Sequence, residues 1–264
     1  MSKTGKSRRY RTRAVISLIF LAIGLCSCER TARQPAANEQ KGLIKVVVVT
    51  GGHEFERKPF LAMFDSFKNI NYAEAEQKND SEIFEDIDEW DYDVIVLFNM
   101  TQEISPQRRK NFTALLERGT GLLALHHSIG AFQKWPEYRR IIGAKSYLET
   151  TVEDGKTYPA CGFLHDIDYN IKVEDAGHPI TQGLRDFAVH DETYNNCVYE
   201  ADNRLLLSTD HPTSDKPLGW VRNYGKSNVC YIQMGHGPEI FANDNYRRLV
   251  AQAIEWCAGG LKQD

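Results

Sequence analysis

Residues 121–130 of this chain read Gly-Leu-Leu-Ala-Leu-His-His-Ser-Ile-Gly, which places His126 and His127 directly after an apolar run. A short apolar run bounded by glycine is typical of a buried parallel strand. Open α/β sheets bind their ligands at the carboxyl ends of such strands. Residues 229–237, Val-Cys-Tyr-Ile-Gln-Met-Gly-His-Gly, repeat the order of strand, glycine and histidine. We therefore expect two strand ends to meet at one pocket.

The rest of the chain alternates predicted strands with predicted helices. Apolar or β-branched runs predict strands at 43–49, 92–98, 122–125, 204–208, 218–222 and 228–234, and amphipathic spacing predicts helices at 57–68, after Ser105-Pro106 and at 246–257. Strand, helix and strand at this spacing indicate an α/β fold with a mainly parallel sheet. Residues 143–190 interrupt the alternation, with one predicted strand at 169–173, and we interpret them as an insertion that shapes a pocket.

The first 28 residues have the pattern of a signal peptide, with a basic start, an apolar stretch at 14–25 and small residues near a cleavage site. The ending Leu25-Cys26-Ser27-Cys28 is similar to a bacterial lipobox, which makes Cys28 the predicted lipidation residue. Cys26 is the alternative acceptor, and a plain cleaved signal or an uncleaved anchor are the other interpretations. We expect an exported protein, either periplasmic or anchored to a membrane by a lipid, with a polar tether at 29–42 and one domain at 43–260.

Charge and cysteine usage narrow the possible partners. Removal of residues 1–28 takes away six basic and no acidic residues, which changes the net charge from −4 to −10. Nucleic acid as a partner is disfavoured, because its phosphates require a basic surface. The remaining cysteines show no CxxC or other paired spacing, so free thiols are favoured over disulfides. These are Cys161, Cys197, Cys230 and Cys257.

Histidines follow three of the predicted strands. His53 follows the first, His126 and His127 follow the third, and His236 follows the last. Imidazole transfers protons near neutral pH and binds metals such as zinc. His53, His126 and His236 are therefore candidate ligands of a divalent metal. The alternative is that each histidine caps a helix or bonds a loop carbonyl.

Other polar groups add candidate roles. Asp191, Glu192 and Tyr194 lie in one dense polar cluster. A carboxylate there could orient a histidine, bind a metal or hold sugar hydroxyls. The alternative is a solvated turn, which has a similar composition. Trp220 and Arg222 lie near a strand end, and an indole beside a guanidinium is suited to a ring-shaped, oxygen-rich ligand such as a sugar. The alternative is that both residues belong to an ordinary surface strand. Gly52 lets the backbone approach a ligand. No nucleotide-binding glycine motif and no G-x-S-x-G is present, so we expect no nucleotide cofactor and no serine hydrolase.

Taken together, several of these motifs resemble the ThuA-like, or trehalose utilisation, family. They are Thr50-Gly-Gly-His53, the elbow at His126, His178-Pro-Ile-Thr, Asp191-Glu-x-Tyr194, Trp220-x-Arg222-x-Tyr-Gly-Lys and Gly235-His236. The resemblance implies a three-layer, flavodoxin-like fold of the class I glutamine amidotransferase type, with helices on both faces of the sheet. Those enzymes carry a cysteine at the elbow where this chain has His126, so thioester chemistry is not expected.

The resemblance also implies a carbohydrate substrate and a functional link to sugar 3-dehydrogenases. A 3-keto group acidifies the proton on C2 of a sugar, so a histidine can abstract it while a metal or fixed donors stabilise the enolate. The expected catalytic residues are His126, His236 and Glu192. The expected substrate-binding residues are Gly52, His127, Asp191, Tyr194, Trp220 and Arg222.

Three functional hypotheses remain open from the sequence. The first is an exported lyase, hydrolase or isomerase acting on 3-keto-glycosides or other disaccharide derivatives by histidine- or metal-assisted proton transfer. The second is a non-catalytic sugar-binding lipoprotein, and the third is a relic of an amidotransferase. Several histidines with a carboxylate at strand ends favour the enzyme, because a binding module can rely on aromatic platforms instead.

Overall fold

The computed structural model of the protein describes residues 42–78, 80–153 and 155–260. In the first part of the chain the elements are β1 (Ile44–Gly51), α1 (Arg57–Asp65), β2 (Ile70–Glu76), η1 (Glu82–Phe84), β3 (Val94–Asn99), α2 (Pro106–Arg118), β4 (Gly121–Leu125), η2 (His126–Gly130) and α3 (Pro136–Ile142). The next are β5 (Ala144–Lys145), β6 (Thr151–Glu153), β7 (Lys156–Tyr158), β8 (Gly162–Val173), β9 (Phe187–Asn195) and β10 (Val198–Tyr199). The last are β11 (Arg204–Ser208), β12 (Pro217–Tyr224), β13 (Ser227–Ile232), α4 (Pro238–Ala242) and α5 (Asp244–Cys257).

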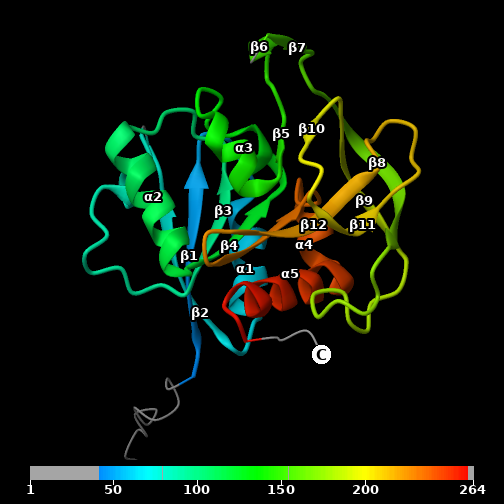
Figure 1. The fold of residues 1–264 in the computed structure, drawn as a ribbon. Coiled ribbons are helices and arrows are strands. Elements are labelled where there is room, and N and C mark those ends of the chain that lie inside the picture. The colour runs from blue at the N-terminus through cyan, green and yellow to red at the C-terminus, as the bar shows by residue number, and fades with distance from the viewer. Residues whose placement is uncertain (1–41, 79, 154, 261–264) are drawn as a thin grey trace, which may run out of the picture. The chain divides into compact units, whose positions relative to one another are not determined.

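A nine-stranded sheet connects both halves of the chain in the order β2-β1-β3-β4-β13-β12-β11-β8-β9 (Figure 1). The first five of these strands pair in parallel. The other neighbours pair antiparallel. The predicted α/β class with a largely parallel sheet is confirmed, and the antiparallel strands extend that sheet on one side.

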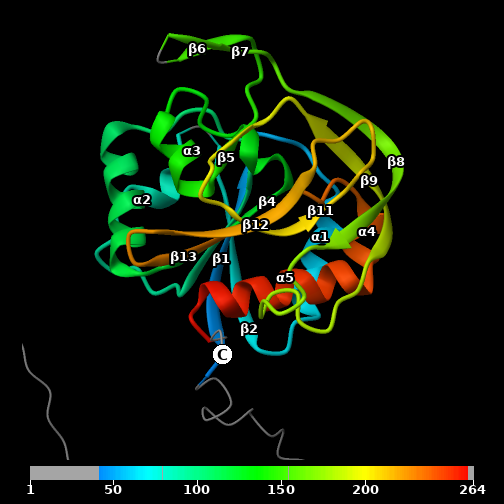
Figure 2. The ribbon, with the colours of Figure 1, turned by 45° about the vertical axis from the view of Figure 1, so that its right-hand side comes forward.

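Alternation along the buried strands produces two hydrophobic layers. In β1, Val46 and Val48 face a cluster that includes α1 and α5, whereas Val47 and Val49 face a cluster that includes α2 and α3. A strand buried on both faces needs apolar side chains at every position, which explains the unbroken valine run. Figures 1 and 2 show α1 and α5 on one side of the sheet and α2 and α3 on the other. This is the predicted three-layer arrangement.

The long strand β8 leaves the sheet for most of its length. Among the described residues, only Lys172 and Val173 of β8 pair with β11, whereas the ladder with β9 extends from Ile171 back to Gly162. Residues 162–171 and 187–195 therefore form a two-stranded ribbon, which we call the β8–β9 arm. Figure 2 shows β8 curving along the side of the molecule. The arm carries side chains toward the carboxyl edge of the parallel strands.

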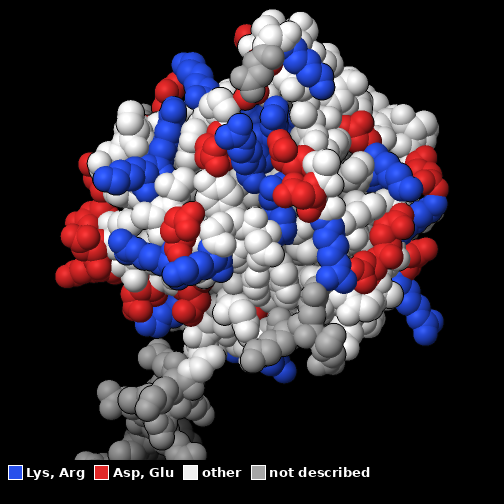
Figure 3. Space-filling model, viewed as in Figure 1, with Lys and Arg blue, Asp and Glu red and all other residues white. Residues whose placement is uncertain are grey.

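Several sequence-based expectations concern the start of the chain. The signal peptide at 1–28, the lipidation residue Cys28 and the tether, except Gly42, lie outside the described residues. Within the described part, no helix has the length and apolar character needed to cross a membrane. On the face seen in Figure 3, basic and acidic side chains are interspersed, and no continuous basic stripe crosses it.

Candidate active site

His126 occupies a strained elbow directly after β4. Its φ of 50° lies in the left-handed region, which residues with a Cβ rarely adopt. Tyr231 holds the elbow by donating to the His126 carbonyl at 2.9 Å. The end of β13 packs closely beside it, because a Cβ on Gly235 would lie only 3.0 Å from the His126 Cβ. The glycine before His236 therefore lets the two strand ends come together.

The hydrogen bonds of His126 determine what its second ring nitrogen can do. The Nδ1 atom lies 2.8 Å from the carbonyl oxygen of Gln233, which can only accept, so Nδ1 carries a proton. In the neutral ring the Nε2 atom then carries a lone pair and no proton. This atom lies 3.1 Å from the Oε2 atom of Glu192. A lone pair facing a carboxylate is repulsive. The arrangement is favourable when Nε2 is also protonated or when a cation binds both atoms.

Glu192 lies where three imidazoles converge. Its Oε2 atom is 3.1 Å from His126 Nε2 and 3.4 Å from His236 Nδ1, and its Oε1 atom is 3.5 Å from His165 Nδ1. Burial alone would raise the pKa of Glu192, but the hydrogen bonds that it accepts from His126 with Nε2 protonated and from His236 outweigh burial and hold that pKa well below its usual range. The side chain is therefore an ionised carboxylate in a buried setting.

His236 is a partly exposed imidazole of this group, less buried than His126 and less exposed than His165. The hydrogen bond with Glu192 raises its pKa, against the opposing effect of partial burial. Its backbone is held by Asp191, whose two carboxylate oxygens accept the N–H groups of Gly235 and His236, each at 2.8 Å. Burial raises the pKa of Asp191, and these two N–H groups counteract that rise. Asp191 thus fixes the loop that carries His236.

His127 and His53 form a second imidazole pair beside the first. Their rings stack with centroids 4.6 Å apart. Burial lowers the pKa of His127 well below its usual value, and the neighbouring imidazoles of His126 and His53 lower it further. Its Nε2 atom has no hydrogen-bond partner among the described residues. His127 is therefore a neutral imidazole with an unused ring nitrogen.

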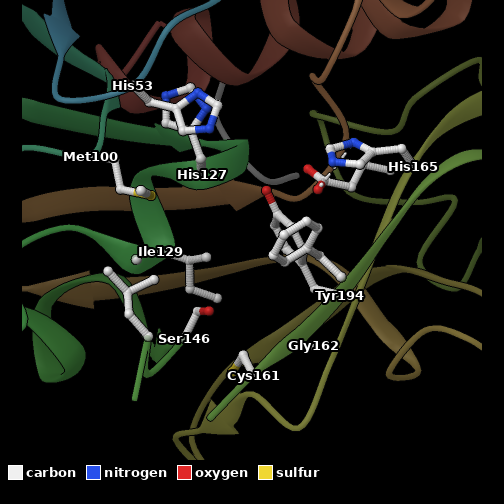
Figure 4. A pocket seen from close by; sticks show the side chains of 13 residues that line it. His53, Met100, His127, Ile129, Ser146, Cys161, Gly162, His165 and Tyr194 are labelled. Atoms are coloured by element: carbon white, nitrogen blue, oxygen red, sulfur yellow. Dashed lines mark ion pairs between the residues drawn. The ribbon is translucent and has the colours of Figure 1, made fainter.

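A cavity of about 290 Å³ opens beside these groups. Figure 4 shows His53 and His127 beside Met100 on one side of the cavity, His165 and Tyr194 on the other side, and Ser146 and Cys161 farther from the histidines. The Tyr194 hydroxyl lies 3.1 Å from His126 Nε2. The complete lining is His53, Met100, His127, Ile129, Gly130, Ser146, Leu148, Cys161, Gly162, Phe163, His165, Glu192 and Tyr194. The cavity thus joins a hydrogen-bonding end to a mostly apolar wall, as small-molecule sites do.

Sequence reasoning did not select His165. In the arm, Leu164 pairs with Thr193 and Ile167 pairs with Asp191, so β8 has an irregular stretch opposite Glu192. Asp166, with a φ of 58°, turns the backbone there. A bulge of this kind re-aims a side chain, and here the His165 ring packs against the His236 ring, tilted by 47° with centroids 4.4 Å apart. The only sequence signal is a His-Asp pair within residues expected to be an irregular insertion.

Trp220 and Arg222 lie away from this site, contrary to the substrate-binding expectation. The Trp220 ring is buried, and its Nε1 atom donates to the Ile142 carbonyl at 2.8 Å. The Arg222 guanidinium bonds Asn203 and Asp202. The reason is strand direction: β12 runs antiparallel to β13, so its carboxyl end lies at the edge where β13 begins. His236, which follows β13, lies at the opposite edge.

Gly52 has a conformational role in the described structure. Its φ is 74°, and a Cβ would lie 2.4 Å from the backbone nitrogen of Thr101. Only glycine fits such a close approach between the loops that follow β1 and β3. This approach positions the next residue, His53, at the cavity.

Three of the converging side chains can hold a metal ion. One ligand atom from each of His126, Glu192 and His236 lies within 4.8 Å of the others. Two imidazole nitrogens and a carboxylate oxygen are a donor set suited to zinc and similar divalent ions. The lone pair of His126 Nε2 directed at Glu192 fits that use. Glu192, and not His53 as expected from the sequence, is the third residue of this candidate ligand set. The His53 ring stacks on His127 instead.

Comparison with known proteins gives a consistent assignment. The ThuA family, described as trehalose utilisation, matches residues 45–257. The chain belongs to this family. No curated protein sequence matches it.

Solved structures agree on the fold. A putative ThuA-like protein from Parabacteroides merdae has a TM-score of 0.69 at 18% identity, over 84% of this chain and 92% of that one. A second, from Bacteroides uniformis, has a TM-score of 0.59 at 19% identity, over 81% and 91%. PurLQS from Thermotoga maritima has a TM-score of 0.51 at 15% identity, over 81% and 99%. The predicted resemblance to the ThuA family and to the class I glutamine amidotransferase-like fold is confirmed.

Proposed function

We propose that this protein is an enzyme that processes 3-keto-glycosides or related disaccharide derivatives by metal-assisted proton transfer. The observation that carries the proposal is the convergence of three imidazoles, those of His126, His165 and His236, on the buried carboxylate of Glu192. Buried carboxylates surrounded by histidines in a cavity are typical of catalytic rather than structural sites. The membership in a trehalose utilisation family supports a carbohydrate as the ligand.

His126, Glu192 and His236 would hold the ion. A divalent cation at this position supplies Lewis-acid stabilisation of negative charge on a carbonyl or enolate oxygen. The protein prepares the ligands before binding: Gln233 fixes the Nδ1 proton of His126, and Asp191 fixes the backbone of His236. Such support determines which ring nitrogen faces the site.

His127 is the candidate base for the proton on C2 of the sugar, and its Nε2 atom, which is buried in this structure, must become accessible when the substrate enters. Its lowered pKa keeps the imidazole neutral at pH 7, and its Nε2 atom carries no other hydrogen bond among the described residues. His165 and Tyr194 line the same cavity and can donate to sugar hydroxyls. Elimination and isomerisation begin with removal of this proton, and hydration of an eliminated product returns a proton to the same carbon, so the site is compatible with a lyase, a hydrolase or an isomerase.

The cellular setting belongs to the same proposal. The basic and apolar start of the chain, followed by Cys28, favours an exported lipoprotein that is anchored to a membrane. The substrate would come from an enzyme that oxidises a sugar at its third carbon, because only that oxidation acidifies the C2 proton in the required way.

The test is to incubate the purified protein with 3-keto-glucosides, with and without a chelator, and to identify products by mass. We expect turnover that the chelator abolishes and zinc restores. H236A should lack turnover and metal, whereas H190A, a histidine replacement at an exposed position of β9, should keep both. Turnover that survives both the chelator and H236A would overturn the proposal. A metal-free protein that binds sugar without turnover would favour the non-catalytic sugar-binding alternative.

A further inference from the structure

Two cysteines that are distant in sequence lie side by side at the cavity wall. The Sγ atoms of Cys161 and Cys197 are 3.5 Å apart. Cys161 comes directly before β8, and Cys197 follows β9 by two residues. The two strands pair antiparallel, with Gly162 opposite Asn195, so the ladder itself brings the two thiols together.

The surrounding backbone holds both residues in place. The N–H group of Cys161 donates to the Tyr147 carbonyl at 2.8 Å. The N–H group of Cys197 donates to the carboxylate of Asp215 at 2.9 Å. Between the strands and Cys197, Asn196 adopts a φ of 61° and turns the chain back toward Cys161. The sulfurs therefore meet through fixed backbone positions.

We propose that Cys161 and Cys197 are an oxidation site whose thiols close into a disulfide at the open end of the β8–β9 arm. A disulfide needs its sulfurs about 2.05 Å apart, so closure requires the present separation of 3.5 Å to shorten. The proposal does not depend on the reaction catalysed in the cavity.

The chemistry requires a small-molecule disulfide, such as oxidised glutathione, as the oxidant. Cys161 is the thiol that such an oxidant would meet, because it is partly exposed and lines the cavity. The hydrogen bond with Cys197 lowers the pKa of Cys161 to about 7, whereas the same bond and burial raise the pKa of Cys197. Cys161 is thus the cysteine that more readily forms a thiolate, and Cys197 keeps its proton. Thiolates are the attacking species in thiol–disulfide exchange.

The step balances as two exchanges. The Cys161 thiolate attacks one sulfur of the oxidant, the oxidant's S–S bond breaks, and one small thiol leaves. Cys197 then loses its proton and attacks the Cys161 sulfur, which releases the second small thiol. The two protein thiols are oxidised, and one small disulfide is reduced to two thiols.

Closure would tie the start of β8 to the end of β9. The arm between them carries His165 and Glu192, so the cross-link would fix the wall that supplies these groups to the cavity. Cys230 and Cys257 are buried, and burial raises the pKa of both thiols. They are built-in controls, because buried thiols of raised pKa do not react.

The experiment uses the full chain, reduced and then equilibrated with oxidised glutathione. Free thiols are alkylated, the protein is digested without reductant, and peptides are mapped by mass, which separates these cysteines from Cys26 and Cys28. We expect a cross-linked peptide pair containing Cys161 and Cys197 with two hydrogens fewer than its separate parts, and alkylated Cys230 and Cys257. The oxidised protein should melt about 5–10 °C above the reduced protein.

Two variants complete the test. C197S should stop at the mixed disulfide between Cys161 and glutathione, whereas the matched control C257S should still form the cross-link. Alkylation of both Cys161 and Cys197 after treatment with the oxidant would overturn the proposal, and so would a wild-type protein that stops at the mixed disulfide.

Discussion

The Nε2 atom of His126 lies 3.1 Å from the Oε2 atom of Glu192, and the two residues are only 1% and 5% exposed. The two side chains come from opposite parts of the fold, His126 from the elbow after β4 and Glu192 from the edge strand β9. Their contact is therefore a product of tertiary structure, and it is the part of the site that mutations can test most directly.

Replacement of Glu192 by glutamine should weaken zinc binding by at least about 10-fold, the smallest loss typical even of groups that only support a ligand, because the amide removes the negative charge of a direct ligand. Isothermal titration with zinc measures the effect. E149Q, a similar change outside this site, should bind zinc as the wild type does. Equal zinc affinity of E192Q and the wild type would contradict the assignment of Glu192 as a ligand.

The metal-free protein should show a stability difference between the wild type and E192Q that depends on pH. The folded-state pKa of Glu192 is lowered, so its contribution is present above its unfolded pKa of about 4.3 and is lost as the pH falls further. The folded-state pKa of His236 is raised, so its contribution is present below its unfolded pKa of about 6.5 and is lost as the pH rises through the folded value. The difference should be largest between these limits.

Thermal unfolding of both proteins in chelator at a series of pH values gives the measurement. The gap in melting temperature should be widest near pH 5–6 and should shrink as the pH rises through the raised pKa of His236. A gap that stays constant over this range would mean that the ion pair is not the source of the difference.

Replacement of Gly235 by alanine should destabilise the protein by about 1–3 kcal/mol. The new Cβ would meet the His126 Cβ at 3.0 Å and the Tyr246 hydroxyl at 3.1 Å, and the φ of 146° disfavours any side chain. The matched control is G259A, where φ is also positive but no atom lies within 4 Å of the new Cβ. Denaturant unfolding compares them, and similar losses would show that contact with the elbow is not important.

Replacement of Arg222 by alanine should leave zinc affinity unchanged within about twofold, because the guanidinium bonds Asn203 and Asp202 at the far edge of the sheet. Stability should fall by about 1 kcal/mol, mainly through lost packing of a mostly buried side chain. Titration with zinc and denaturant unfolding give the two values. A loss of zinc affinity comparable to that of E192Q would place Arg222 in the site after all.

The strand ends were predictable because parallel strands share a direction. Once the runs before His53, His126 and His236 were interpreted as parallel strands, their carboxyl ends had to lie on one edge, and the structure places all three there. The same reasoning failed for Arg222, since β12 is antiparallel and periodicity carries no information on strand direction.

The contribution of the arm was harder to predict. The sequence shows Asp191 and Glu192 as a polar cluster, but its pattern does not distinguish a solvated turn from the buried strand that contains them. The position of His165 depends on an irregular register between β8 and β9, which depends in turn on long-range pairing. The pairing of Cys161 with Cys197 has the same origin, because 36 positions separate them in sequence and only the ladder makes them neighbours.

The elbow and the arm also have a consequence for the coupling of ion binding to folding. His126 follows β4, Glu192 lies on β9 and His236 follows β13, so the three ligand groups meet only after the tertiary fold has formed. An ion that needs all three would bind folded molecules in preference to unfolded ones, and its affinity would add directly to the stability of the folded state. Loss of the ion would then increase the share of molecules that unfold and become open to proteolysis.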